Sequence, residues 1–470
     1  MKTSNRIRPT VKGVTVLDTF EKVVEYLYDI PRFTKKNSLD HTKALLKELG
    51  DPQEKFKILH VAGSNGKGSV CMFLNCMLQK TGKKVGLFTS PHLVDIRERF
   101  QIDGQMCGKE EFLTAFSIVE QAVEKMQKKN LPHPTFFEII FAIGMVIFVR
   151  ADVEYVVLET GLGGRLDATN AVAHPILTII TSISLEHTEY LGDTIAQIAG
   201  EKAGIIKPGI PVVYDGTEEA AAAVIAQRAK ELSCPVCEIS SQMCKINEIK
   251  RNFIDFCLLT EYDNGTRWKI PFVADYQTRN AALAITGIRM LQQLNKGKMD
   301  KMDSVIEELT DAQAADALMH ARWPGRMEEI LPEVYLDGGH NVAGIREFIK
   351  TASRLVKEDK ISPILLFSMV KDKDYSHAVE ILSSEMCWNQ IIVTSIPNAR
   401  GLSVQELEQV FQQVQQDNIC GITDCGKAFE AAMDAKKVGQ KLFCTGSLYF
   451  VGALKEYLQT KERSSQNDQF

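Results

Sequence analysis

The fold is decided by the stretch His60-Val61-Ala62-Gly63-Ser64-Asn65-Gly66-Lys67-Gly68-Ser69. An apolar run from Phe56 to Val61 leads into it, and a helical pattern from Ser69 to Gln79 follows. A glycine-rich loop between a buried strand and a helix turns backbone N–H groups toward phosphate oxygens, with the positive end of the helix behind them. Lys67 adds a mobile cation, and the Ser69 hydroxyl can bind Mg²⁺. The stretch therefore predicts a phosphate-binding loop from Gly63 to Ser69.

This loop departs from the generic phosphate loop by one residue. The generic form ends in Gly-Lys-Ser or Gly-Lys-Thr, whereas here Gly68 stands between Lys67 and Ser69. The alternative is a glycine-rich turn that binds nothing. Such a turn requires neither the lysine nor the serine between a strand and a helix, so we favour the phosphate loop.

The surrounding sequence alternates short apolar runs with longer amphipathic segments. Further strands are predicted at Lys84–Phe88, Tyr155–Leu158, Ile176–Ile183 and Pro211–Tyr214, and further helices at Asp193–Ala203 and Glu218–Lys230. Strands that read as continuous apolar runs are typical of parallel sheets covered on both faces. The pattern therefore predicts an α/β fold whose N-terminal part is a mostly parallel sheet carrying the phosphate loop.

The pattern changes after residue 260. Asp263-Asn264-Gly265 is a hairpin turn signal and predicts a small antiparallel patch. A helix is predicted from Gln277 to Leu294, and the lysine-rich segment from Asn295 to Asp303 interrupts the pattern.

A second α/β series follows Trp323-Pro324-Gly325-Arg326. Its strands are predicted at Val334–Leu336, Ile364–Phe367, Gln390–Thr394 and Lys441–Cys444. A chain of 470 residues is about three times the ~150 of a typical domain, so two domains are expected. We place their boundary near residue 320, giving a phosphate-loop domain over 1–320 and a Rossmann-like domain over 321–470.

Composition narrows the class of protein. With 45% hydrophobic and 24% charged residues, the chain is typical of soluble globular proteins. Its formal net charge of −5 makes nucleic acid and anionic membrane poor partners. The apolar run from Ile139 to Val149 is shorter than the ~20 residues of a membrane span. The opening residues lack the apolar stretch of a signal peptide, so we expect a cytoplasmic protein.

The cysteines also indicate a reducing compartment. The 11 cysteines are an odd number scattered along the chain, which favours reduced, mostly buried thiols over a disulfide framework. Cys234-Pro-Val-Cys237 has metal-site spacing, but it lacks a second such pair. We therefore interpret it as a connection between a helix and a strand.

The Gly-Lys-Gly-Ser loop resembles that of the Mur ligase superfamily, and other motifs resemble the folylpolyglutamate synthase/dihydrofolate synthase family. In family order they are Thr89-Ser90-Pro91-His92-Leu93, Thr135-Phe136-Phe137-Glu138, Leu158 to Asn170 (LETGLGGRLDATN), Leu185-Glu186-His187, Glu201 to Gly209 (EKAGIIKPG), Trp323 to Arg326, Asp337-Gly338-Gly339-His340-Asn341, Asp372-Lys373-Asp374 and Thr445 to Tyr449 (TGSLY). Gly339 stands where the family usually has alanine.

Three residues could contribute to a metal centre. Glu159 closes a buried strand, where it is either a Mg²⁺ ligand or a solvated carboxylate. His187 follows another strand and by its own pattern is more often structural, because Mg²⁺ prefers oxygen. Lys202, at the end of a helix, by itself suggests a cation that complements the helix dipole.

The resemblance implies more specific roles for these residues. It implies two Mg²⁺ ions, one bound by Ser69 and a second by Ser90, Glu159 and His187, as well as a monovalent cation. It also implies that CO₂ carbamylates Lys202, which converts a cation into a carboxylate for the second metal.

Further site residues also come from the resemblance. It implies that Arg326 and Asp337 contact ATP, that Asn280 and Tyr449 lie near the nucleotide, and that His340 and Ser447 place the incoming L-glutamate. By its own pattern Tyr449 is as compatible with a core aromatic residue on a helix. Asp167 is our candidate for a hydrogen bond to the pterin ring, and Lys67, Lys202 and His340 are the candidate catalytic residues.

The resemblance implies an ATP-dependent ligase. A pterin carboxylate attacks ATP to form an acyl phosphate, and the glutamate amine then displaces phosphate. Both dihydropteroate and reduced folates are expected acceptors, because the Gly-Gly-Arg-Leu-Asp-Ala-Thr-Asn form resembles bifunctional bacterial enzymes. Two alternatives stay open: a Mur-type or other amino-acid ligase, and a nucleotide-dependent switch without catalysis. A monomer is the family expectation.

Overall fold

The computed structural model describes residues 19–30, 38–295, 306, 308–397, 400–414, 416 and 418–467. The strands are β1 (Lys57–Ala62), β2 (Val85–Phe88), β3 (Phe100–Ile102), β4 (Gln105–Met106), β5 (Tyr155–Glu159), β6 (Leu177–Ile180), β7 (Val212–Asp215), β8 (Val236–Ile239), β9 (Cys244–Ile249), β10 (Ile254–Thr260), β11 (Asp263–Ile270), β12 (Glu328–Leu331), β13 (Val334–Leu336), β14 (Ile364–Phe367), β15 (Gln390–Val393), β16 (Ile419–Gly421) and β17 (Leu442–Thr445). The α-helices are α1 (Phe20–Asp29), α2 (Leu39–Glu48), α3 (Lys67–Gln79), α4 (Lys109–Lys128), α5 (Phe136–Arg150), α6 (Thr188–Leu191), α7 (Ile195–Ala203), α8 (Glu219–Glu231), α9 (Tyr276–Asn295), α11 (Asp311–Met319), α12 (Val342–Val356), α13 (Tyr375–Ser384), α14 (Val404–Gln413), α15 (Cys425–Ala435) and α16 (Leu448–Asn467).

The first sheet has eight strands in the order β4-β3-β2-β5-β1-β6-β7-β8. From β2 to β8 every pairing is parallel, and only the pairings of β3 with β2 and with β4 at one edge are antiparallel. Its central strand β1 contributes Leu59 and Val61 to the core shared with α3 and α9, and Ile58 to the core shared with α4 and α5. Helices therefore cover both faces, which confirms the predicted α/β fold.

The predicted antiparallel patch is the three-stranded sheet β11-β10-β9. Its hairpin turn lies two residues before the predicted position, because Asp263 already pairs with Thr260. The Asp263 carboxylate accepts hydrogen bonds from the Thr266 backbone (2.9 Å) and from Trp268 Nε1 (2.9 Å). This aspartate therefore fixes the start of β11 and the tryptophan beneath it, and the turn is made by the two residues before it.

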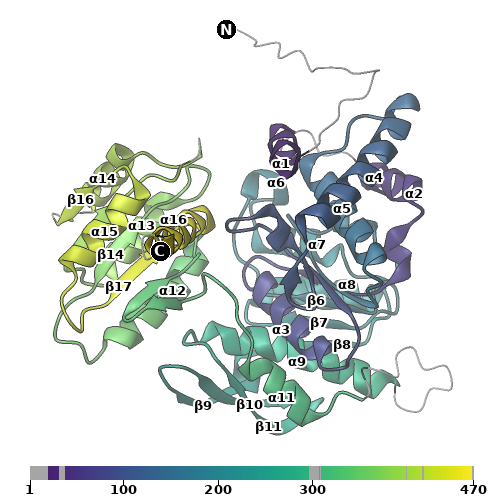
Figure 1. The fold of residues 1–470 in the computed structure, drawn as a ribbon. Coiled ribbons are helices and arrows are strands. Elements are labelled where there is room, and N and C mark those ends of the chain that lie inside the picture. The colour runs from purple at the N-terminus through teal and green to yellow at the C-terminus, as the bar shows by residue number, and fades with distance from the viewer. Residues whose placement is uncertain are drawn as a thin grey trace.

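The second sheet, in the order β12-β13-β17-β14-β15-β16, is formed entirely by residues after 327. It is parallel except for β12. Helices α12 to α14 pack on one face and α15 and α16 on the other. Figure 1 shows this part as a separate green-to-yellow lobe. The change from one set of sheets to the other falls between α11 and β12, close to the predicted boundary at residue 320.

Other features of the sequence have a place in this fold. The run from Ile139 to Val149 lies in the buried helix α5, and in the part of the chain that the structure describes no helix is both long and apolar enough to cross a membrane. All 11 cysteines are free, but only four are buried, so the prediction of mostly buried thiols was wrong. Cys234 lies between α8 and β8, as predicted. Most of the lysine-rich segment after Asn295 lies outside the described residues.

Candidate active site

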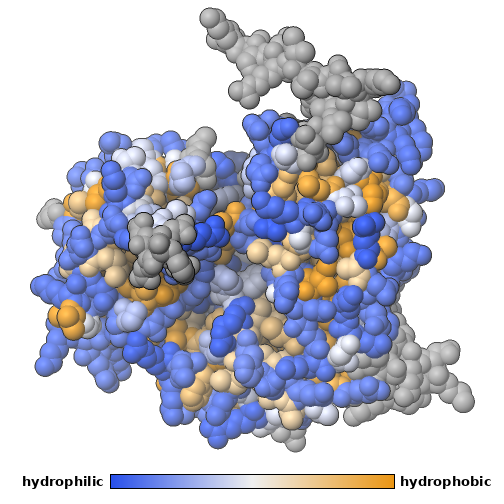
Figure 2. Space-filling view, in the orientation of Figure 1, coloured by the Kyte–Doolittle hydropathy of each residue, from blue (hydrophilic) through white to orange (hydrophobic). Residues whose placement is uncertain are grey.

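A cavity of about 580 Å³ opens between the two lobes at the carboxyl ends of both sheets. Figure 2 shows the surface hollowed between the lobes. Except for Gly63, every residue predicted for the site lines this cavity: Ser64, Asn65, Gly66, Lys67, Gly68, Ser69, Ser90, Glu159, Asp167, His187, Lys202, Asn280, Arg326, Asp337, His340, Ser447 and Tyr449. The fold thus brings the predicted residues of both lobes to one place, while their individual roles stay predictions.

Glycines shape the phosphate loop because distant residues pack against it. Gly63 has φ +151°, and a Cβ there would lie 1.8 Å from Thr181 Oγ1. A Cβ on Gly68 would lie 2.7 Å from the Trp323 ring. The inserted glycine that distinguishes this loop from the generic form therefore lets Trp323 pack on the first turn of α3. The loop then delivers the N-terminus of α3 to the cavity.

The polar side chains of the loop are held in place. Lys67 Nζ donates to the carbonyls of Gly63 (3.0 Å) and Ser64 (3.2 Å), so the cation lies folded over its own loop. Ser69 is buried, and its Oγ accepts from Gln277 Nε2 at 3.2 Å. Asn280 donates to the same glutamine at 3.0 Å. One glutamine on α9 thus connects the serine and the asparagine, although the sequence analysis assigned it no role.

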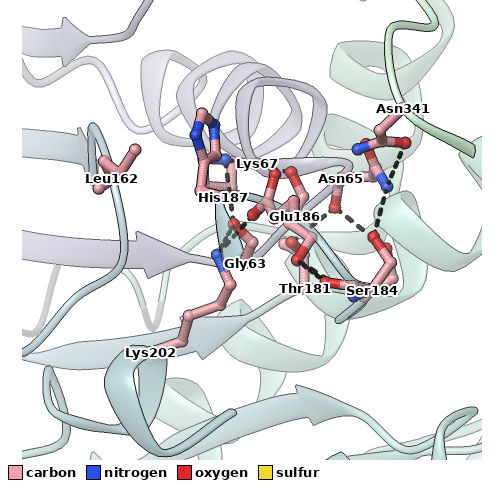
Figure 3. Close-up of polar contacts among 12 residues, drawn as sticks. Gly63, Asn65, Lys67, Leu162, Thr181, Ser184, Glu186, His187, Lys202 and Asn341 are labelled. Atoms are coloured by element: carbon pink, nitrogen blue, oxygen red, sulfur yellow. Dashed lines mark hydrogen bonds and ion pairs between the residues drawn. The ribbon is translucent and has the colours of Figure 1, made fainter. Parts of the chain in front are cut away.

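Lys202 points at the phosphate loop and lies away from solvent. Its Nζ donates to Gly63 O and to Glu186 Oε1, both at 2.8 Å, as Figure 3 shows. The side chains of Lys202 and Glu186 are 1% and 6% exposed. Burial lowers the pKa of Lys202, although Glu186 opposes the change. These contacts disfavour the alternative in which Lys202 only complements a helix dipole.

Burial also opposes ionisation of Glu186, but the positive charges of Lys202 and Lys67 outweigh it and hold the pKa of this carboxyl below its usual range. Glu186 therefore remains an anion. Glu186 lies within the Leu185-Glu186-His187 motif, and no role was predicted for it. Its position in the loop that follows β6 is the signal that could have identified it.

Glu159 is a buried carboxyl group at the end of β5. Burial raises its pKa to about 7, against the opposing charge of Lys67. Its Oε2 accepts from the Ser90 backbone N–H at 3.0 Å. Ser90 therefore contacts Glu159 through its backbone amide. A group that is half-neutral near pH 7 will ionise fully once a cation lies beside it.

His187 receives a side chain from the other lobe. Lys373 Nζ donates to His187 Nε2 at 3.1 Å. Burial, followed by the nearby Lys373 charge, lowers the pKa of His187 to about 4, so the ring is neutral at pH 7. Burial lowers the pKa of Lys373 as well. The lone pair of His187 Nε2 thus accepts a hydrogen bond from the ammonium group of Lys373. A metal ion that binds this nitrogen has to displace that ammonium group.

The wall formed by the second lobe begins at the end of β13. Asp337 accepts hydrogen bonds from the backbones of Met327 (3.0 Å) and Gly339 (2.8 Å) and from Tyr276 Oη (3.3 Å), and burial raises its pKa. Burial lowers the pKa of His340 to about 3, and its Nδ1 lies 2.9 Å from Gly338 O. That carbonyl requires a proton on Nδ1, which leaves Nε2 as a neutral acceptor.

At the start of α16, Ser447 Oγ accepts from the Tyr449 backbone at 3.2 Å. Tyr449 is half-buried, and its hydroxyl accepts from Arg400 at 3.0 Å. It therefore has a polar partner in the cavity wall. The interpretation as a core aromatic residue does not account for that partner.

The Asp167 carboxylate accepts hydrogen bonds from donors in its own loop. Oδ1 accepts from the Thr169 backbone (3.0 Å) and hydroxyl (2.6 Å). Oδ2 accepts from the backbones of Gly161 (3.1 Å) and Leu162 (2.9 Å). A carboxylate offers about four lone-pair sites, and these four donors fill them. A pterin amine could bind only by replacing one of them, so the geometry favours a loop-shaping role.

The two lobes meet across the cavity through an amide pair. Asn341 Nδ2 donates to Asn65 Oδ1 at 3.0 Å, and Asn65 in turn approaches Asn341 Oδ1 and Ser184 Oγ, as Figure 3 shows. Arg279 on α9 also pairs with Glu347 on α12 at 2.9 Å. These pairs join residues far apart in the chain, so local sequence patterns could not identify them.

The donor chemistry can be compared with Mg²⁺. Ser69 and Glu159 offer oxygen atoms, which this ion prefers. Within the described residues, no group of three His, Cys, Asp or Glu side chains could hold a metal ion. An ammonium at Lys202 repels a cation. The donor set therefore suits one Mg²⁺, and it suits a second only if Lys202 acquires an anionic group and Lys373 releases His187.

Comparison with known proteins gives a consistent picture. Residues 61–287 match the Mur ligase middle domain. The dihydrofolate synthase/folylpolyglutamate synthase of Bacillus subtilis is 33% identical over 432 residues, covering 91% of this chain and 96% of that protein. A Mycobacterium tuberculosis folylpolyglutamate synthase with ADP and AMPPCP has a TM-score of 0.79 at 25% identity, covering 93% of this chain and 97% of that chain. The structure of E. coli FolC in complex with DHPP and ADP has a TM-score of 0.78 at 25% identity, covering 95% of this chain and 99% of that chain. The chain therefore belongs to the folylpolyglutamate synthase/dihydrofolate synthase family of ATP-dependent ligases.

Proposed function

We propose that this chain joins L-glutamate to the carboxyl group of dihydropteroate and of reduced folates, with ATP activating that carboxyl group as an acyl phosphate. One observation carries the proposal: a single cavity places the phosphate loop of the first lobe opposite the wall of Asp337, His340 and Ser447 from the second lobe. Relatives that were solved with ADP and with DHPP support this choice of ligands.

The residues divide the reaction between the two lobes. The N-terminus of α3 and Lys67 bind the ATP phosphates and stabilise the charge that develops during phosphoryl transfer. The second lobe brings the glutamate amine. Neutral His340, with an acceptor at Nε2, can accept a hydrogen bond from that amine and so orient it toward the acyl phosphate. Closing the lobes excludes water, which would otherwise hydrolyse the acyl phosphate.

We place one Mg²⁺ at Ser69 and a second at Glu159, His187 and Ser90. A bound Mg²⁺ supplies positive charge next to the phosphate oxygens. Glu159 suits this role, because a buried carboxyl with a pKa near 7 gains an ionised form when a cation binds. The second site requires Lys373 to leave His187.

The second site also requires Lys202 to be carbamylated, which forms a bond between Nζ and CO₂ and releases a proton. Only a neutral amine can attack CO₂, and burial favours that form of Lys202. A ¹³C-labelled bicarbonate sample should therefore show a carbamate carbon that Lys202→Met lacks. The variant should lose turnover by orders of magnitude while it still binds ATP, and acetate should restore part of the turnover. Turnover near the wild-type level without acetate contradicts the role.

A Mur-type ligase with another acceptor and a non-catalytic nucleotide switch are the competing functions. The buried Glu159, Lys202 and Glu186 beside the phosphate loop favour catalysis, because a switch has no use for them.

Product analysis decides between these functions. The protein is incubated with ATP, Mg²⁺ and L-glutamate, and with dihydropteroate, a reduced folate or a UDP-linked peptide in turn. Mass spectrometry should then show glutamyl products of both pterins, with one phosphate released per product. A product from the UDP-linked peptide alone indicates the Mur-type ligase, and ATP binding without any amide product indicates the switch.

A further inference from the structure

The second lobe places a cation in the cavity wall that the proposed mechanism does not use. Arg400 follows β15 and lines the same cavity as the phosphate loop, His340 and Ser447. Its side chain is 32% exposed, so the guanidinium lies at the surface of the wall and within reach of a ligand. Arg400 belongs to none of the motifs quoted from the sequence.

The guanidinium of Arg400 is fixed in orientation. Nε and Nη2 donate to the two carboxylate oxygens of Asp372, at 3.3 and 2.5 Å. Nη1 donates to Tyr449 Oη at 3.0 Å, and the guanidinium carbon lies 5.4 Å from the centre of that ring. A planar cation held on two sides loses little entropy when it binds a further anion.

The backbone of Arg400 is fixed as well. Its carbonyl accepts from the Lys371 backbone at 2.8 Å, and the next residue, Gly401, forms an antiparallel bridge with Val370. The segment that carries Asp372 and Lys373 is therefore tied to Arg400 directly. Lys373 extends from it toward His187, where the reaction centre is proposed, while Asp372 turns to Arg400.

L-Glutamate carries a second carboxylate that could bind the Arg400 guanidinium. The amine and the α-carboxylate share one carbon, so the α-carboxylate must lie beside the acyl phosphate when the amine attacks it. The side-chain carboxylate carbon lies three carbon–carbon bonds from that shared carbon. Tyr449 connects the two groups along the cavity wall, since its backbone N–H contacts Ser447 Oγ and its hydroxyl contacts Arg400. A glutamate placed by Ser447 can therefore extend its side chain along Tyr449 to the guanidinium.

We propose that Arg400 binds the side-chain carboxylate of the incoming L-glutamate and thereby sets the amino-acid specificity of the ligase. The inference rests on the proposed function. A guanidinium fork matches a carboxylate, whereas it gives the neutral amide of glutamine no charge partner. The carboxylates on the glutamyl tail of a folate acceptor have the same chemistry, so the test must separate the two sources.

The test compares Arg400→Gln with the wild type, using dihydropteroate, which has no glutamyl tail, and separately a reduced folate. Wild-type phosphate release that depends on glutamate establishes the proposed function first, and its absence overturns that function and leaves no basis for the inference. For Arg400→Gln we expect the KM for L-glutamate to rise about 10- to 100-fold with both acceptors, while the KM for ATP stays within twofold. The ratio of kcat/KM for L-glutamate over L-glutamine should fall by a similar factor.

Three variants complete the design. Arg228→Gln removes an exposed arginine on α8 that does not line the cavity, and it should leave both KM values unchanged. Arg400→Lys keeps the charge without the fork and should retain part of the discrimination. Asp372→Asn weakens the anchor of Arg400 and should lower the preference for L-glutamate over L-glutamine less than Arg400→Gln does. It provides a second test if Arg400→Gln folds poorly. A discrimination ratio that stays at the wild-type value, a KM change confined to ATP, or a change seen only with the folate acceptor overturns the proposal.

Discussion

Replacing Lys202 by methionine removes the cation of a buried ion pair and leaves a side chain of similar length. Glu186, 6% exposed, then loses the partner 2.8 Å away. Removing one member of a buried pair typically costs about 3–5 kcal/mol, because the remaining charge stays buried without compensation. A cation that only complements a helix dipole contributes ~0.3–1 kcal/mol. In buffer free of CO₂ and bicarbonate, where Lys202 is unmodified, we therefore expect Lys202→Met to lower the free energy of unfolding by about 3–5 kcal/mol at pH 7.

Urea unfolding of the wild type, Lys202→Met, Glu186→Gln and the double variant measures this effect as a double-mutant cycle. The double variant leaves no buried charge at the pair, so it should be more stable than the sum of the single losses predicts, by about 2–3 kcal/mol. Arg165→Met is the matched control, because Arg165 is 57% exposed and pairs with Glu201, the residue next to Lys202. An exposed pair of this kind should contribute less than about 1 kcal/mol.

The pH dependence of Lys202→Met gives a second readout. Without Lys202, burial raises the pKa of Glu186, so the carboxyl can take up a proton and shed the buried charge. The stability deficit of the variant should therefore shrink as the pH falls from 7 to 5. A deficit below about 1 kcal/mol with no coupling to Glu186 would refute the buried pair.

Three further predictions concern Lys67 in the phosphate loop, Asp167 and the buried His60. Lys67→Ala should reduce product formation with dihydropteroate and with folate together, by at least about 100-fold at an unchanged thermal midpoint, since one phosphate loop serves both; a wild-type rate with either acceptor contradicts a single site. The sequence predicts that Asp167→Ala harms dihydropteroate use more than folate use. Because this carboxylate holds four hydrogen bonds within its own loop, the structure instead predicts similar losses of kcat/KM, and a difference of tenfold or more would favour direct pterin contact. Burial lowers the pKa of His60 to about 3, so below pH 6.5 only the unfolded chain takes up its proton and stability decreases as the pH falls. His60→Gln should therefore reduce the slope of unfolding free energy between pH 6 and 4 by ~1.4 kcal/mol per pH unit, and equal slopes would contradict this.

Most of the central strands were predictable because strands buried on both faces read as continuous apolar runs. β13 and β14 were located with the bounds that the structure has. The edge strands were missed. Residues of β12 alternate between half-buried and exposed, and β16 has three residues, all half-buried. Such strands carry little hydrophobic signal, because they are held by pairing with a neighbour and bury little apolar surface.

The site was predictable where its residues follow strand ends, since parallel strands bring their carboxyl ends to one edge. Glu159 was found in this way, whereas the role of Asp337 was predicted from the family resemblance. What the sequence could not supply was the set of partners. Lys373 contacts His187 across 186 residues, and Asn341 contacts Asn65 across 276. No local pattern relates such pairs, because only the closure of two lobes over one cavity brings them together.

The phosphate loop shows the same limit within a motif that looks local. Its glycines were predicted to let the backbone approach phosphate. That role does not explain why Gly68 is inserted between Lys67 and Ser69. In the structure, a Cβ on Gly63, Gly66 or Gly68 would collide with Thr181, Asn280 or Trp323, respectively. Each glycine therefore makes room for a distant residue. The motif Trp323-Pro324-Gly325-Arg326 leads into the second lobe, so Gly68 also allows the chain between the lobes to pack on α3. The inserted glycine thus makes room for the segment that joins the lobes.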